Sequence, residues 1–399
     1  MSSRVKKYET PPTLYYLMLL TFLATAPGFY LGLTDGTVSP EVGTLLFGIA
    51  IFGAAFFLCW AAEAAQIDIS ESLAVAILAL LAVLPEYAVD FVFTWKAAHD
   101  PEQAHFAIAN MTGANRLLVG LGWPAVLLIY IFAKKRKEIV MDRSQRVEIF
   151  YLAMATVYSF TIPLKGSLTL IDTVILVSLF ALYTRRVAQM ETVEPEMVGP
   201  VKIIANMRDG PRRLVTVLFF LWAGAVIFLV AEPFAHSLVS MGREFGINEF
   251  LLVQWLAPIA SESPEFIVAA TWAVRGAAGS ALKALISSKV NQWTLLVGTI
   301  PLVFSISSGA VRVFPLDSLQ QHELLLTAAQ SLFGVAVLVN LNLRRREGIL
   351  LAALFCAQLI VAQIRLEVML IYLLLAAVYL VAQRRHLIPA LHTGLGLKE

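Results

Sequence analysis

The sequence predicts an all-α membrane protein of about twelve transmembrane helices, arranged as two inverted five-helix repeats with one extra helix at each end. Three observations predict this fold class. Hydrophobic residues make up 59% of the chain, whereas soluble domains contain roughly 45–50%. Those residues gather in runs of about 20, the length of helix that crosses a bilayer. An acidic motif, Pro85-Glu86, recurs as Pro264-Glu265 inside a later run.

The apolar runs follow one another along the chain, and each predicts one helix across about 30 Å of hydrocarbon. They lie near residues 13–33, 42–65, 71–95, 103–132, 146–164, 169–184, 214–241, 250–274, 279–306, 323–342, 348–364 and 366–383. The last three have the least sharp boundaries. The one long polar segment, 185–213, contains several Glu, Pro and Gly residues, and we expect it to be a cytoplasmic linker between two halves.

Basic residues are divided unequally between the loops, and short loops rich in Lys and Arg stay in the cytoplasm. Alternate loops are basic at residues 134–137, 185–186, 212–213, 344–346 and 384–385. The loops between them carry acidic or few charges, as at Asp35 and Asp100. This pattern places both termini in the cytoplasm, and we expect an integral protein of the plasma (inner) membrane.

The first run also has features of a signal peptide, because a basic start and an apolar centre precede Ala24-Thr25-Ala26. We favour retention of this helix over cleavage. Cleavage would leave the topology of the other spans unchanged.

An internal repeat is visible in the spacing of particular residues. Glu86 and Glu265 are 179 positions apart, and Asn115 and Asn291 are 176 apart. The segment from Asp142 to Glu148 also resembles that from Asp317 to Glu323. Five spans per copy is an odd number, so the second copy enters the membrane from the opposite face, as in many secondary transporters. The predicted parts are the N-terminal helix 1–41, the repeats 42–184 and 214–364, the linker 185–213, and the C-terminal helix and tail 365–399.

Acidic residues lie deep inside the predicted spans. A charged side chain at the bilayer centre costs roughly 2.5–3.5 kcal/mol, so Glu86, Glu262 and Glu265 must face water, a cation or a proton. Pro85 and Pro264 leave carbonyls of the preceding turn without their usual donor. Carboxylates beside such carbonyls form a hard oxygen site for calcium, sodium or a proton. The less favoured alternative is a pair of proline kinks with structural glutamates.

These motifs resemble those of the sodium/calcium exchanger-like cation antiporter superfamily, which includes calcium/proton exchangers. Each repeat of that superfamily carries Thr-Ser-x-Pro-Glu on one helix and Gly-Ser-Asn-x-x-Asn (or Asp) on the next. The second copy here reads Ser261-Glu262-Ser263-Pro264-Glu265, and the first reads Ala82-Val83-Leu84-Pro85-Glu86. The resemblance extends over both predicted repeats and is closer for the Pro-Glu helices than for the Asn helices.

The resemblance implies roles for single residues. Glu86 and Glu265 correspond to the paired central ligands. Hydroxyl or carbonyl oxygens are expected from Ser261, Thr112 and Ser288.

The second ligand of each copy is less certain in position. In the superfamily a Leu-Gly step follows the Asn motif. Counting back from the corresponding Gly122 and Gly298 places the second ligand at Arg116 and Gln292, whereas another register moves the first of these to Leu118. Asn115 and Asn291, beside the favoured positions, are candidates to have taken over the ligand role.

Several departures from the superfamily pattern change the expected charge of the site. Ala82 and Val83 replace hydroxyl residues, and Glu262 adds a carboxylate. Arg116 is a permanent cation, and we expect it to pair with Glu262 or Glu86 in the site rather than to reach the surface. Lys289 would remove a further negative charge if it faced inward, but we expect it to snorkel to an interface.

The sequence therefore predicts a secondary-active antiporter that exchanges calcium or sodium against protons or sodium by alternating access at a midplane carboxylate site. The alternative is a non-transporting membrane scaffold or sensor with a degenerate ion site. We expect no enzyme activity, because the chain has no His-Glu-x-x-His, no Gly-x-Ser-x-Gly and no His cluster.

We expect the transported ion in the site and no cofactor, with inorganic cations and membrane lipid as partners and no nucleic acid. Access would alternate as the long helices 42–65 and 214–241 slide against the ligand-bearing helices. Gly48, Gly53 and Gly224 would allow their close packing.

Overall fold

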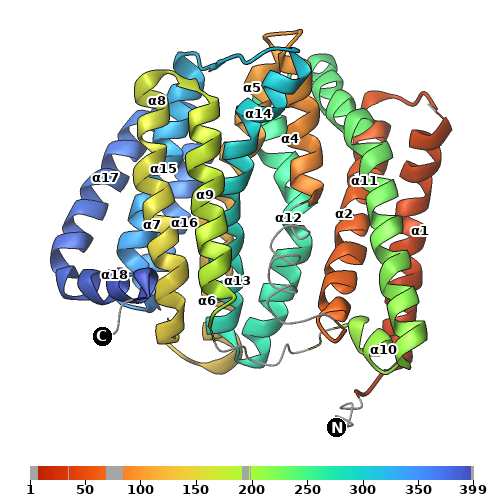
Figure 1. The fold of residues 1–399 in the computed structure, drawn as a ribbon, viewed down its shortest axis with the longest axis horizontal. Helices are drawn as coiled ribbons and strands as arrows, with labels where there is room; N and C mark the ends of the chain where they lie inside the picture. The colour runs from red at the N-terminus through yellow and green to blue at the C-terminus, as the bar shows by residue number, and fades with distance from the viewer. Residues whose placement is uncertain (1–7, 35, 69–83, 191–196, 198, 397–399) are drawn as a thin grey trace. The chain divides into compact units, whose positions relative to one another are not determined.

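The computed structural model is built almost entirely of helices (Figure 1). It describes residues 8–34, 36–68, 84–190, 197 and 199–396. Asp35, Ala82 and Val83 lie outside the described residues, as does much of the run predicted at 71–95. The chain forms two compact units that interleave in sequence. Unit 1 consists of Met1–Val92 and Ala188–Pro264, and unit 2 consists of Phe93–Val187 and Glu265–Glu399.

The described residues of unit 1 contain four whole helices: α1 (Pro12–Thr34), α2 (Pro40–Ala65), α10 (Val201–Ala205) and α11 (Asp209–Phe245). Two further helices, α4 (Leu84–Ala97) and α12 (Glu249–Arg275), begin in unit 1 and end in unit 2.

The first half of unit 2 contains α5 (Gln103–Leu117), the π-helical turn η1 (Leu118–Gly122), α6 (Trp123–Lys134), β1 (Glu138–Val140), η2 (Arg143–Gln145), α7 (Arg146–Ser159), α8 (Thr161–Lys165), β2 (Ser167–Leu168) and α9 (Leu170–Val187). The second half contains α13 (Ala278–Asn291), the π-helical turn η3 (Gln292–Leu296), α14 (Val297–Ser307), β3 (Phe314–Pro315), α15 (Ser318–Leu338), β4 (Asn342–Arg344), α16 (Arg345–Ile360), η4 (Ala362–Ile364), α17 (Arg365–Ala382), η5 (Arg384–His386) and α18 (Leu387–Leu395).

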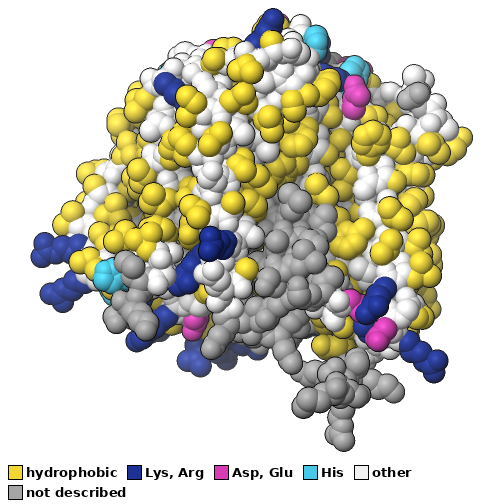
Figure 2. Space-filling model, viewed as in Figure 1, with side chains coloured by type: hydrophobic (Ala, Val, Ile, Leu, Met, Phe, Trp, Pro, Cys, Tyr) yellow, Lys and Arg dark blue, Asp and Glu magenta, His cyan; other side chains and the backbone are white. Residues whose placement is uncertain are grey.

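Seven helical segments of the described chain are long and apolar enough to cross a membrane: Pro12–Thr34, Pro40–Ala65, Gln103–Lys134, Arg143–Lys165, Asp209–Phe245, Ala278–Ser307 and Ala362–Ala382. Large hydrophobic side chains such as Phe132 and Phe228 are 79% and 84% exposed. Figure 2 shows hydrophobic side chains over most of the helical surface in view, which suits a lipid environment better than water. The all-α membrane class is thus confirmed, while the count of twelve spans and the inverted order of the repeats stay predictions.

Close helix packing in unit 1 depends on two of the three predicted glycines. The helices α2 and α11 pack along each other, and α1 packs on both. A Cβ atom at Gly53 would lie 2.6 Å from Cγ2 of Thr25, and one at Gly48 would lie 3.2 Å from Cε2 of Phe234. The prediction is wrong for Gly224, where an added Cβ meets nothing within 4 Å.

The linker ends earlier than the hydropathy pattern predicts, because α11 begins at Asp209. Pro211 lies in the first turn of α11. Backbone N–H groups there have no intrahelical acceptor, so a proline at this position removes no helical hydrogen bond. Arg212 therefore belongs to the helix, and its Nε and Nη2 atoms donate to Asp68 at 2.7 and 2.8 Å. Arg213 Nε donates to the same carboxylate at 2.9 Å. The hydrogen bond from Arg212 lowers the pKa of Asp68, and the cluster joins the end of α2 to the start of α11.

Short antiparallel pairings bring together loops from the two halves of unit 2. Strand β1 pairs with β4, so the basic segments 134–137 and 344–346 lie at the same end of the unit. Strand β2 pairs with β3. Because α7 and α8 run between β1 and β2, and α15 runs between β3 and β4, the two pairings mark opposite ends of these helices. The predicted alternation of basic and weakly basic loops is consistent with this arrangement.

Two five-residue π-turns interrupt the long helical segments of unit 2, one after α5 and one after α13. A π-turn shifts backbone hydrogen bonding from the fourth to the fifth residue, and such turns are frequent at functional sites. In η1, Gly120 allows Phe355 of α16 to approach the backbone. A Cβ atom at Gly120 would lie 2.2 Å from Cγ of Phe355.

We expect Gly120→Ala to destabilise the protein by about 1–3 kcal/mol, because the added methyl group would force Phe355 or the π-turn to move. Thermal unfolding of the purified variant in detergent measures this loss. The matched control is Gly224→Ala, in which the methyl group enters open space and should change the stability by no more than about 0.5 kcal/mol. Equal losses in the two variants would contradict the packing argument.

Candidate functional site

The residues predicted to form the ion site are divided between the two compact units. Unit 1 carries Glu86 on α4, with Ser261 and Glu262 on α12. Unit 2 carries Glu265 at its start, Thr112, Asn115 and Arg116 on α5, Ser288 and Asn291 on α13, and Gln292 at the start of η3. The pairing of Glu86 with Glu265 stays a prediction.

The three acidic residues are all withdrawn from solvent. Glu86 and Glu262 are only 2% and 4% exposed, and Glu265 is partly buried. The Oε2 atom of Glu265 is buried and has no hydrogen-bond partner among the described protein groups. A buried carboxylate oxygen is unfavourable without a donor, a proton or a cation, so this atom is a good candidate for ion binding. No group of three His, Cys, Asp or Glu side chains gathers as a metal site within the described ranges.

Two of the three predicted hydroxyl ligands bond to their own helices. Thr112 Oγ1 donates to the carbonyl of Ile108 at 2.6 Å, and Ser261 Oγ donates to that of Ala257 at 3.2 Å. Such bonds to the preceding turn are common for Ser and Thr in helices. Each hydroxyl oxygen keeps its acceptor lone pairs, so both residues remain possible oxygen ligands.

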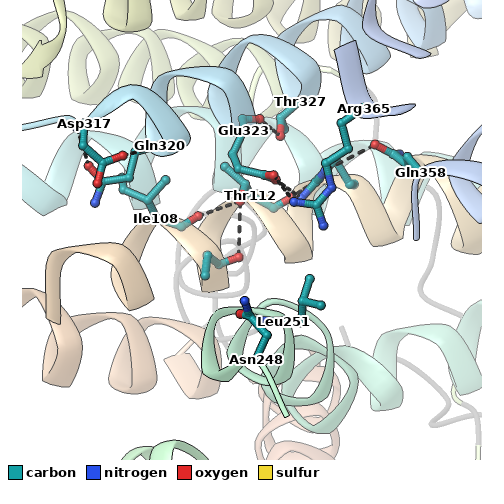
Figure 3. Close-up of polar contacts among 12 residues, drawn as sticks. Ile108, Thr112, Asn248, Leu251, Asp317, Gln320, Glu323, Thr327, Gln358 and Arg365 are labelled. Atoms are coloured by element: carbon teal, nitrogen blue, oxygen red, sulfur yellow. Dashed lines mark hydrogen bonds and ion pairs between the residues drawn. The ribbon is translucent and has the colours of Figure 1, made fainter. Parts of the chain in front are cut away.

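Arg116 is fully buried and takes part in an ion network that links four elements of unit 2. Its guanidinium forms an ion pair with Glu323 of α15, and its Nη1 atom donates to Gln358 of α16 at 3.2 Å. The other oxygen of Glu323 pairs with Arg365, the first residue of α17. Figure 3 shows Glu323, Arg365 and Gln358 converging on this network. In the described part of unit 2, this network pairs two arginines with the single carboxylate of Glu323.

This network bears on two expectations for Arg116. The alternative of a surface arginine is wrong, since its side chain is 0% exposed. The structure pairs it with Glu323, a partner that the sequence does not suggest, while the predicted pairing with Glu262 or Glu86 stays a prediction. The similarity of segments 142–148 and 317–323 indicates that Glu323 is the counterpart of Glu148 in the repeat. Hydropathy does not predict that Glu323 contacts α5.

A second buried glutamate occupies the corresponding place in the first half of unit 2. Glu148 of α7 is 0% exposed, and the Nζ atom of Lys283 on α13 lies 3.5 Å from its Oε1 atom. Glu148 and Glu323 are 175 positions apart. Each therefore links its helix, α7 or α15, to an Asn-containing helix, α13 or α5. Sequence reasoning missed both pairs as contacts.

Lys289 does not reach an interface, so that expectation is wrong. It lies in the segment Ala278–Ser307, and at 1.5 Å per residue it is about 16 Å from the start of α13. Its side chain is too short to cover that distance. The Nζ atom instead donates to the backbone oxygen of Asn115 at 2.9 Å and to its Oδ1 atom at 3.0 Å. It also lies 5.2 Å from the ring centroid of Trp293.

Comparison with known proteins places this arrangement among transporters. The family model described as "Sodium/calcium exchanger protein" matches residues 39–188 and 215–364. The chain is similar to the solved H⁺/Ca²⁺ exchanger CAX, with 43% identity over 96% of this chain and 98% of that chain and a TM-score of 0.93. No curated protein matches.

Two further solved structures share the fold at lower identity. YfkE has 16% identity over 85% of this chain and 98% of its own, with a TM-score of 0.63. The sodium-calcium exchanger NCX_Mj has 18% identity over 80% of this chain and 98% of its own, with a TM-score of 0.54.

Proposed function

The chain belongs to the sodium/calcium exchanger protein family, and from that premise we propose that it is a secondary-active antiporter that exchanges calcium or sodium against protons or sodium. Proteins of this family are transporters rather than enzymes. The observation that carries the proposal is the 43% identity to an H⁺/Ca²⁺ exchanger over 96% of this chain. Calcium exchanged against protons is therefore the first pair of ions to test, and sodium is the rival.

The proposed ion site uses Glu86, Glu262 and Glu265 near the middle of the membrane, where two inverted repeats would meet. The two segments matched by the family model, 39–188 and 215–364, support the predicted repeats. Support also comes from the π-turns after α5 and α13, and from the buried glutamates 175 positions apart. The unpaired Oε2 atom of Glu265 is the feature of the described protein that most directly suits a bound ion or proton.

Asn115 and Asn291, with Gln292, Ser261, Ser288 and Thr112, are the proposed neutral oxygen ligands around these carboxylates. Calcium accepts carboxylate, carbonyl and amide oxygens in flexible numbers. The buried cations Arg116 and Lys289 lower the negative charge available to a divalent ion. That effect is why a monovalent cargo remains a rival.

Alternating access would come from movement of α2 and α11, which belong to unit 1, relative to the ligand helices α5 and α13, which belong to unit 2. The close contacts of Gly48 with Phe234 of α11 and of Gly53 with Thr25 of α1 support tightly packed helices that move as one body. The basic segments joined by β1 and β4 support a cytoplasmic position for that end of unit 2. With twelve spans, both termini would then be cytoplasmic, in the plasma (inner) membrane.

Reconstitution into vesicles tests the proposed function. The purified protein is placed in vesicles with an acidic interior, and calcium is added outside. We expect calcium uptake that consumes the proton gradient and stops when a protonophore removes it. A sodium gradient in place of the proton gradient tests sodium coupling. Vesicles that take up neither calcium nor sodium under any gradient would favour the scaffold or sensor alternative.

A further inference from the structure

The ammonium group of Lys289 lies where two oxygens of one predicted ligand converge. Both the backbone oxygen and the Oδ1 atom of Asn115 accept hydrogen bonds from it, at 2.9 and 3.0 Å. The Nδ2 atom of Asn115 donates to the carbonyl of Met111 at 2.9 Å. This bond fixes the amide with its oxygen toward Lys289, so Asn115 is held as an acceptor on that side.

The surroundings of this ammonium have the chemistry of a monovalent cation site. A backbone carbonyl, an amide oxygen and the face of Trp293 all meet the charge. Such neutral oxygens replace the hydration shell of monovalent ions in ion-binding proteins, and an aromatic face adds a cation–π attraction. Lys289 and Asn115 are both 0% exposed.

The backbone next to the π-turn supplies the oxygen for this contact. Asn115 and Arg116 lie just before η1, and their carbonyl oxygens accept from the side chains of Lys289 and Gln330 respectively. A π-turn changes which amide faces each carbonyl at such a junction. The helix therefore presents main-chain oxygens to cationic or amide donors at this point.

The contact is asymmetric between the predicted repeats. Asn291 is the counterpart of Asn115, and the position 176 residues before Lys289 is Gly113. Glycine has no side chain, so no equivalent contact from that position to Asn291 exists. The fixed charge of Lys289 therefore has no counterpart at the corresponding position of the first predicted repeat.

We propose that Lys289 is a tethered cation, whose ammonium takes the Asn115 oxygens that a mobile monovalent cation would otherwise bind. The proposal rests on the cation site of the proposed function and makes Lys289 a determinant of its ion selectivity. Because the ammonium group of Lys289 occupies the two Asn115 oxygens, this part of the site does not require bound sodium. A lysine that merely ties α13 to α5 would instead contribute stability without any relation to the ions in solution.

Sodium dependence of thermal stability separates these two roles without any transport measurement. The full-length protein is purified in detergent, and Tm is measured in equal concentrations of sodium chloride and choline chloride. The sodium-minus-choline difference in Tm of the wild type is the baseline, and it includes any sodium bound at the proposed carboxylate site. In Lys289→Met, sodium should also bind the vacated oxygens and make this difference larger than that of the wild type by at least about 2 °C.

Three results bear on specificity. The double variant Lys289→Met/Asn115→Leu should lose the additional sodium response, and Lys137→Met, in an exposed loop, should show none. If Lys289→Met is not monodisperse in choline, purification in sodium should recover it. A sodium response in Lys289→Met no larger than that of the wild type, or the same loss of folded protein in both salts, would overturn the proposal. Failure of calcium uptake by wild-type vesicles would count against the proposed function instead, because the Tm measurement does not depend on transport.

Discussion

Glu265→Gln is expected to abolish cation exchange and leave the protein folded. The amide has the size of the carboxylate but neither its charge nor its ability to release a proton. Because Oε2 of Glu265 is buried without a protein donor, no ion pair in the described structure is broken at that atom. Removing an uncompensated buried charge should keep or raise stability. Calcium uptake should fall to the level of protein-free vesicles.

The control for this experiment is Glu244→Gln, which removes an exposed carboxylate near the end of α11. It should retain wild-type uptake. Both variants are first compared with the wild type in size-exclusion chromatography and thermal unfolding. Wild-type exchange by folded Glu265→Gln would remove Glu265 from the site and with it the proposed mechanism.

Glu323→Ala is expected to lower the free energy of unfolding by about 3–5 kcal/mol, the usual effect of removing one partner from a buried ion pair. The substitution would leave the guanidinium groups of Arg116 and Arg365 together in the protein without the carboxylate that both of them contact. Thermal unfolding in detergent measures the loss. We also expect α15, α16 and α17 to lose protection in hydrogen exchange, since the network joins them to α5.

An exposed ion pair provides the comparison. Arg243 and Glu249 lie 2.9 Å apart, and the Arg243 side chain is 59% exposed, so Glu249→Ala should change stability by about 0–1 kcal/mol. The double variant Arg116→Met/Glu323→Leu should recover much of the loss, because an apolar pair leaves no buried charge. A Glu323→Ala loss as small as that of Glu249→Ala would show that the network does not stabilise unit 2.

The class of the protein and the positions of its helices were predictable because they depend on local properties. Hydropathy and the length of a membrane-crossing helix are read along the chain, so every predicted run that the structure describes contains a helix. Helix α11 begins five residues before the predicted run, since the polar residues from Asp209 to Arg213 belong to the helix without adding hydropathy. Motif spacing likewise located Glu86 and Glu265 and the family to which the chain belongs.

The partners of the buried cations could not be predicted in this way. Arg116 bonds to groups 207 and 242 positions away, and Lys289 to one 174 positions away. Their partners depend on which faces of α5, α13, α15 and α16 meet, and a repeat in sequence does not specify that. The amino-acid sequence is sufficient to establish a membrane protein with acidic motifs at repeated positions. The contacts of Arg116 with Glu323 and of Lys289 with Asn115 follow from the packing of the helices, because a buried charge must find its partner wherever packing places one.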